Sequence, residues 1–247
     1  MRIRLVSAVI GLALLTSAVP SAFAVGVAYV YDDDLAARDA FDALLSSEGF
    51  SVTTVPMSQA DAFPFTSVDV IVIGRDTGYQ YNWGTPAAVA NIAGSGRSVV
   101  GVYEGGTAYF HQHDMFTGSW HCAYDFGTDL EARYQSHELW HRPHDIPIAG
   151  DDTVTMYSAA ASALTVWMND APPEVTCYGR YNQSHCALTV HLVSGRFTAL
   201  WSYEGLPAEM TDAGRDLFAN LVWLAWSWQH ADGFESGDTS AWPAAVP

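Results

Sequence analysis

The sequence contains no lysine: its ten basic residues are all arginine, against 27 acidic residues. The resulting formal net charge of −17 repels the phosphates of nucleic acids and anionic membranes, so we expect neither as a partner. An acidic surface is compatible with cations, neutral glycans or a basic partner, and it also serves solubility alone. Charge therefore excludes partners without naming a ligand.

The sequence also lacks an apolar run long enough to cross a bilayer. The run from Leu5 to Leu15 follows Arg2 and Arg4 and precedes a small-x-small site at residues 22–24. This arrangement is typical of a secretory signal peptide over residues 1–24. We expect cleavage after Ala24 and an extracytoplasmic, periplasmic or secreted protein without a membrane span. The mature chain keeps 8 Arg against 27 acidic residues, a net charge of −19.

Cysteine is scarce, with three residues in the chain. Cys177 and Cys186 flank the segment YGRYNQSH between two runs of strand character, so we predict a disulfide that closes a hairpin. Cys122 is then left as a free thiol. We interpret it as a small buried residue rather than as a nucleophile.

Short apolar runs alternate with helical patterns in the first half of the chain. We predict strands over residues 25–31, 51–55, 68–74 and 98–103, and helices over residues 35–49 and 85–96. This alternation is typical of a doubly wound parallel sheet.

The second half follows a different pattern. Residues 111–150 show little periodicity, so we expect loops there, followed by five strands between residues 153 and 204. A Ser194-Gly195 turn predicts a hairpin between the last two strands, and a helix is expected over residues 207–228. Residues 231–247 should form a flexible tail, which resembles a short tail found on exported bacterial proteins.

The segment GVYEGGTAYF, from Gly101 to Phe110, predicts a strand, a tight turn and a helix in succession. Such a turn needs glycine on both sides of its apex, because a Cβ there would meet the neighbouring backbone. Tyr103 occupies the apex. A second segment, ALWSYEGLPAEMTDAGRDLFANLVWLAW, joins the last predicted strand to the last predicted helix.

Together the two segments resemble the class I glutamine amidotransferase-like superfamily, over about residues 25–228. In that family the turn reads G-x-C-x-G, and the late strand ends in His-Pro-Glu before a T-x-x-G-x-x-L-F-x-N helix. Tyr103 stands at the Cys position, and Ser202, Tyr203 and Glu204 stand at His, Pro and Glu. The helix pattern is kept by Thr211, Gly214, Leu217, Phe218 and Asn220.

The resemblance implies one three-layer α/β/α, flavodoxin-like domain over residues 25–230. Its sheet should be mostly parallel, with an antiparallel extension in the C-terminal half. Because Tyr103 and Ser202 replace the thiol and the imidazole of the family triad, we do not expect glutamine hydrolysis.

Polar residues follow the predicted parallel strands. In open α/β sheets, ligands bind in the crevice beyond the carboxyl ends of the strands. The same residues would also have a purely structural explanation if they cap helices or neutralise one another's charges. The crevice predicted here is formed by Asp32, Asp33, Arg75, Asp76, Tyr103, Glu104 and Glu204. At least one of these clustered carboxylates should have a raised pKa.

Histidines form a second group of candidates. His111 and His113 are the residues that could hold a divalent metal, although we expect no cofactor. His137 and His141, in HELWH, have the spacing of helical zinc ligands, but Pro143 and loop-like flanks favour a surface or packing role.

The leading interpretation is an exported, catalytically inactive domain that binds a small molecule, a glycan or a peptide in the crevice. Many of the tyrosines and tryptophans fall in predicted loops, which suits stacking on a sugar or a peptide. One alternative is a hydrolase that pairs Glu104 with Asp76 or Glu204, with or without a metal. The other is a cell-envelope interaction module. The sequence names neither the ligand nor the oligomeric state.

Overall fold

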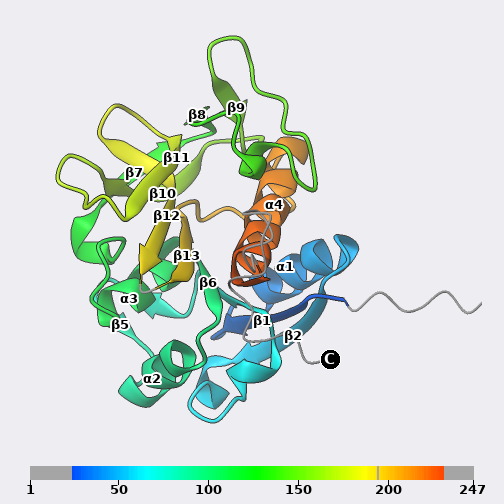
Figure 1. Ribbon diagram of the computed structural model, residues 1–247, viewed down its shortest axis with the longest axis vertical. Helices are drawn as coiled ribbons and strands as arrows, with labels where there is room; N and C mark the ends of the chain where they lie inside the picture. The colour runs from blue at the N-terminus through cyan, green and yellow to red at the C-terminus, as the bar shows by residue number, and fades with distance from the viewer. Residues whose placement is uncertain (1–23, 194, 231–247) are drawn as a thin grey trace, which may run out of the picture.

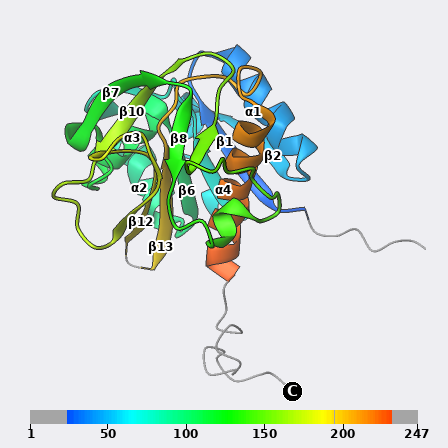
Figure 2. The same cartoon turned by 90° about the horizontal axis from the view of Figure 1, so that it is seen from above.

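The structure is a computed structural model that describes residues 24–193 and 195–230. Helices cover both faces of one mixed sheet, giving three layers (Figures 1 and 2). Residues 1–23 of the predicted signal peptide, the residue Ser194 and the predicted tail lie outside the described residues. Within the described ranges, no helix combines the length and the apolarity needed to cross a membrane.

The first half of the sheet is parallel, in the order β2-β1-β3-β6-β13. These strands are β1 (Gly26–Tyr31), β2 (Ser51–Pro56), β3 (Val70–Ile73), β6 (Ser98–Val102) and β13 (Arg196–Trp201). Every residue of β3 and β6 is buried, because helices cover both of their faces. That double burial explains the unbroken apolar runs, and the predicted flavodoxin-like arrangement is confirmed.

The helices are α1 (Leu35–Ser47), α2 (Pro86–Gly94), α3 (Tyr103–Gln112) and α4 (Asp212–His230). The Asp34 carboxylate accepts from the N–H of Ala37 at 2.9 Å and caps α1. The α4 helix begins five residues later than predicted, because residues 207–210 form a turn. The Thr211 hydroxyl then accepts from the N–H of Gly214 at 3.0 Å and caps the helix.

Two hydrophobic cores lie on opposite faces of the sheet. Alternate residues of each parallel strand enter one core or the other, as the period of a strand requires. The first core contains α1 and α4, whose rings Phe41 and Phe218 lie 5.1 Å apart. The second core contains α2 and α3.

An antiparallel extension continues the sheet from β13 through β12, β11, β8 and β9. It comprises β7 (Cys122–Gly127), β8 (Asp129–Ala132), β9 (Thr153–Thr155), β10 (Ala161–Trp167), β11 (Val175–Arg180) and β12 (His185–Val193). The β7 strand pairs with β10, and β10 also pairs with β12. The five strands predicted after residue 153 are therefore confirmed.

The prediction of loops throughout residues 111–150 is wrong, because β7 and β8 lie there. The β7 strand is short, and its aromatic residues Tyr124 and Phe126 are exposed rather than buried. The smaller elements are the β4 (Gly78–Tyr79) and β5 (Asn82–Trp83) hairpin and the 3-10 helices η1 (Met57–Gln59), η2 (Phe65–Ser67), η3 (Ser119–His121) and η4 (Glu138–Trp140).

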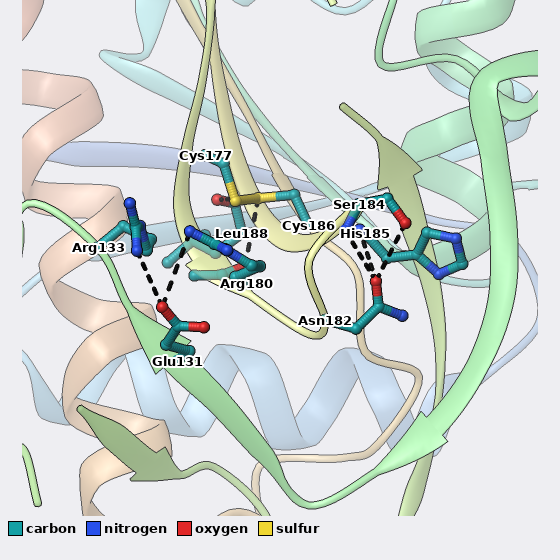
Figure 3. Close-up of a disulfide and its surroundings, with 10 residues drawn as sticks. Glu131, Arg133, Cys177, Arg180, Asn182, Ser184, His185, Cys186 and Leu188 are labelled. Atoms are coloured by element: carbon teal, nitrogen blue, oxygen red, sulfur yellow. Dashed lines mark hydrogen bonds and ion pairs between the residues drawn. A yellow bond between two sulfur atoms is a disulfide. The ribbon is translucent and has the colours of Figure 1, made fainter. Parts of the chain in front are cut away.

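The predicted disulfide is present between Cys177 on β11 and Cys186 on β12 (Figure 3). Beside it, Glu131 forms an ion pair with Arg133 at 2.9 Å (Figure 3). Cys122 is a free cysteine, and burial raises the pKa of its thiol well above the ordinary value. This environment agrees with a packing role for Cys122 and not with a nucleophilic one.

Candidate functional site

The turn between β6 and α3 holds Tyr103 at a φ of +48°, in the left-handed region. A bulky residue there costs on the order of 1–3 kcal/mol, so the surrounding structure must enforce it. A Cβ on Gly101 would lie 2.7 Å from the Cα of Gly106, and a Cβ on Gly105 would lie 2.0 Å from the Gly74 carbonyl oxygen. The glycines thus permit a strained strand-to-helix turn of the kind that presents catalytic nucleophiles.

Tyr103 is 8% exposed and lies among acidic groups. Burial, followed by the charges of Glu204 and Glu104, raises its pKa to about 12, although a hydrogen bond with Ser162 opposes the shift. The phenol is therefore neutral at physiological pH. It can donate a hydrogen bond, but it supplies no nucleophilic oxyanion.

Glu104, the residue after the apex, accepts a hydrogen bond from the Tyr124 hydroxyl. Tyr124 projects from β7 and is 62% exposed. Burial of the hydroxyl and the bond to Glu104 raise the pKa of Tyr124 above its ordinary value. An exposed aromatic ring is therefore held in place beside the turn by a carboxylate.

The residues at the family's His and Pro positions, Ser202 and Tyr203, are packed within the fold. Ser202 is fully buried, and its Oγ has no hydrogen-bond partner among the described residues. Its N–H donates to the carbonyl of Ala187 at 3.0 Å, within the sheet. The Tyr203 hydroxyl donates to the carbonyl oxygen of Asp129 at 2.7 Å. Neither side chain offers a general base to the turn.

Arg75, at the end of β3, is held by two neighbours. Its Nη2 lies 2.6 Å from the Asp34 carboxylate, and its Nη1 donates to the Glu204 carbonyl oxygen at 2.6 Å. Burial would raise the pKa of Asp34, but hydrogen bonds from Ala37 and Arg75 bring it below the ordinary value. The guanidinium of Arg75 is therefore occupied by contacts within the protein.

Asp76 also has a structural function. Its Oδ2 accepts from the N–H groups of Asp32 and Asp34, at 3.0 and 2.8 Å. Asp32 and Asp33 are exposed. Burial, then the charges of Asp33 and Asp76, raises the pKa of Asp32. The predicted raised carboxylate pKa is thus found at Asp32, and the ends of β1 and β3 meet as the topology requires.

A cavity of about 350 Å³ opens beside this cluster. Of the predicted crevice residues, only Arg75 and Glu204 line it. Sequence reasoning missed the other lining residues, which come from β7, β10, the segment between β9 and β10, and the segment between β13 and α4: Phe126, Tyr157, Ser158, Ala159, Ala160, Ala161, Ser162, Gly205 and Glu209. Gly205 and Glu209 belong to the second motif segment, whereas no sequence motif marks the residues of β7, β10 and the segment between β9 and β10.

His111 and His113 do not line the cavity, because α3 carries them roughly 12 and 15 Å from the turn along its axis. His111 packs against Tyr81, with ring centroids 4.9 Å apart. His113 lines a different cavity with Arg196, the first residue of β13. Neither histidine therefore lies among the residues that line the cavity beside Arg75 and Glu204. Neither belongs to a group of three metal-ligating side chains in the described part of the chain.

The histidines of HELWH do not share a ligand position. The His137 Nδ1 accepts from the N–H of Leu139 at 3.1 Å, at the start of η4. His141 lies 2.6 Å from the Asp145 carboxylate and 2.7 Å from the Gln135 carbonyl oxygen. Each imidazole has its own local partners, in agreement with a surface role.

No family model matches the chain, and no curated protein matches it. Solved structures do match. A putative GMP synthase component from Thermoplasma acidophilum has a TM-score of 0.53 and 13% identity, over 84% of this chain and 96% of that chain. The cytoplasmic protein STM1381 from Salmonella typhimurium LT2 has a TM-score of 0.52 and 11% identity, over 81% and 99%.

A glutamine amidotransferase from Methylobacillus flagellatus is also similar, with a TM-score of 0.44 and 11% identity, over 83% of this chain and 94% of that chain. At these identities the likeness concerns the fold. The chain therefore shares the fold of the Thermoplasma and Salmonella structures, which agrees with the resemblance that its two motif segments indicated.

Proposed function

We propose that the protein is an exported domain with the amidotransferase-like fold that has lost glutamine hydrolysis and binds a neutral, hydroxyl-rich ligand of the glycan type. The observation that carries the first part is Tyr103, which occupies the strained apex of the turn as a neutral phenol. Glutamine hydrolysis at this apex needs a thiolate and a base, and the apex has neither. Its geometry is kept while its reactive group is gone.

The chemistry of the cavity supports a neutral ligand. Glu204 and Glu209 contribute carboxylates, which disfavour anions, while Arg75 is already paired with Asp34. Carboxylate and serine oxygens accept and exchange hydrogen bonds with sugar hydroxyls, and the ring of Phe126 offers an apolar face for stacking. A volume of about 350 Å³ lies within the range of small-molecule sites.

Binding of neutral oligosaccharides to the mature protein tests this proposal. A glycan array identifies a ligand, and titration calorimetry then measures its Kd for Glu204→Gln and Phe126→Ala. We expect each change to weaken binding at least about tenfold, the equivalent of one lost hydrogen bond or stacking contact. Tyr134→Ala is the matched control for Phe126→Ala, since Tyr134 is 62% exposed and Phe126 65% exposed, but Tyr134 does not line the cavity. Wild-type affinity in both cavity variants, or a ligand that proves to be a basic peptide, contradicts the proposal.

Hydrolysis is the second candidate function. The charges of Glu204 and Glu104 both raise the pKa of Tyr103, so the two carboxylates lie around the same side chain. Two carboxylates around one bound sugar are the groups that glycoside hydrolysis employs. Release of reducing ends from the bound oligosaccharide, abolished by Glu104→Gln, would favour this candidate. Binding of the oligosaccharide without its hydrolysis would rule out this candidate and support binding as the function.

A further inference from the structure

Glu48, His144 and Asp216 come together from three separate segments. Glu48 follows α1, His144 lies in the loop after η4, and Asp216 belongs to α4. One potential ligand atom from each lies within 4.8 Å of the other two, and all three residues are partly buried. Figures 1 and 2 show α1, α4 and the loop after η4 meeting on one side of the molecule.

We propose that these three residues bind a divalent transition-metal ion of the zinc class. The imidazole Nε2 of His144 lies 2.6 Å from a carboxylate oxygen of Glu48. Metal bonds of about 2.0–2.2 Å hold neighbouring ligand atoms about 3–3.5 Å apart, so an ion requires only small side-chain movements. Three protein ligands leave a fourth position for water.

The backbone around His144 is fixed before any ion binds. Its N–H donates to Oδ1 of Asn220 at 2.9 Å, and Nδ2 of Asn220 donates to the His144 carbonyl at 2.8 Å. Asn220 and Asp216 are one turn apart on α4, so a single helix face anchors the loop and supplies a ligand. Such support from outside the ligand set orients metal ligands.

The charges at the site favour a cation. Glu48 forms its only ion pair within the described ranges with His144. Asp216 has no ion pair there, and the neighbouring Arg215 is paired with Asp212. Two carboxylates therefore share one imidazole, whose charge cannot exceed +1. A divalent ion neutralises both carboxylates.

The nature of the ligands selects the metal. One imidazole nitrogen with two carboxylates suits Zn²⁺ and its neighbours such as Co²⁺, whereas Ca²⁺ and Mg²⁺ prefer all-oxygen sites. The site is also separate from the crevice, because the 13 residues of α1 place Glu48 about 20 Å from Asp34 along the helix. We expect the ion to link the end of α1, the η4 loop and α4.

Calorimetric titration of the metal-free mature protein with ZnCl₂ tests the site. We expect saturable binding of one Zn²⁺, and at least tenfold weaker binding in Asp216→Asn and in His144→Gln. Matched controls are Asp212→Asn, one turn earlier on α4, and His141→Gln in the same loop, which should bind as wild type does. MgCl₂ should not compete. Unchanged Zn²⁺ affinity in the two site variants, or no saturable Zn²⁺ binding by the wild type, overturns the proposal.

A second measurement needs no variant, in case one fails to fold. Diethyl pyrocarbonate modifies accessible imidazoles, and the modified peptides can be mapped by mass spectrometry. The His144 side chain is 33% exposed and that of His141 is 46% exposed, so both should react in metal-free protein. Stoichiometric Zn²⁺ should protect His144 and leave His141 reactive. Equal reactivity of His144 with and without Zn²⁺ contradicts the site.

Discussion

Arg75 donates to the carbonyl oxygen of Glu204 at 2.6 Å, although the two residues are 129 positions apart in the chain. Arg75 follows β3 and Glu204 follows β13, and β6 lies between these strands. The Arg75 side chain therefore reaches across the end of β6, which Tyr103 directly follows, and it links strands that are two strand spacings, or about 10 Å, apart. Together with the Arg75–Asp34 ion pair, it frames the strained turn.

Arg75→Met should remove this frame. We expect a loss of about 1–2 kcal/mol in the free energy of unfolding, because a partly buried carboxylate and a carbonyl lose their donor. Urea denaturation measures the loss. Arg133→Met, which breaks a more exposed ion pair with Glu131, is the control and should cost less than about 1 kcal/mol. Equal effects of the two changes would contradict the structural role of Arg75.

The pH dependence of that loss follows from Asp34, whose pKa is lowered in the folded protein. A lowered pKa stabilises the fold above the ordinary value near 4, and this stabilisation is lost as the pH falls through the folded value. The difference between wild type and Arg75→Met should therefore shrink below about pH 4. A difference that stays constant from pH 7 to pH 3 would contradict this assignment.

The ionisation of Asp32 should change the stability of the fold with pH in the opposite direction to that of Asp34. Its pKa is raised by burial and by Asp33 and Asp76, so its charged form destabilises the fold at neutral pH. The stabilisation from its protonated form is present below the ordinary pKa and lost as the pH rises through the folded pKa. Asp32→Asn should therefore raise the urea midpoint at pH 7 and leave it unchanged at pH 3. Asp170→Asn, at an exposed position, should change neither; a lower midpoint for Asp32→Asn at pH 7 would refute the prediction.

The Cys177–Cys186 disulfide closes a short loop across β11 and β12. Replacing both cysteines by serine should lower the free energy of unfolding by roughly 2–3 kcal/mol, from the greater chain entropy of the unfolded state. Peptide mapping without reduction should show this pair linked and Cys122 free. A peptide linking Cys122 to either of the other cysteines would contradict the pairing.

The parallel half of the sheet was predictable because its signals are local. Burial on both faces gives β3 and β6 unbroken apolar runs, and close backbone approach at the turn requires Gly101, Gly105 and Gly106. Most of the cavity wall was not predictable. In β7 the aromatic residues Tyr124 and Phe126 alternate with Asp125 and Gly127, but the aromatic face is the exposed one, so the pattern does not indicate which face lines a cavity.

The candidate metal ligands were not predictable for a related reason. Glu48 and His144 are 96 residues apart and have no motif in common. The sequence favoured His111 and His113 as metal ligands because they lie close to the turn along the chain. A helix that begins at the turn carries them away from it, so proximity in sequence did not become proximity in space.

Export is tested by the N-terminus of the protein recovered from outside the cytoplasm. We expect it to begin at Val25, because the small-x-small site ends at Ala24. Expression with and without residues 1–24 provides the comparison, and only the full chain should leave the cytoplasm. Recovery of an uncleaved chain from the cytoplasmic fraction alone would refute export.

The most direct test of the central claim is a glutaminase assay on the purified mature protein. Ammonia release from glutamine should not exceed the rate without protein, because Tyr103 stays neutral and Ser202 provides no base. A parallel sample treated with iodoacetamide controls for any contribution of Cys122. Glutamine hydrolysis that persists after alkylation and is lost in Tyr103→Phe would show that the turn is still catalytic, and would contradict the account.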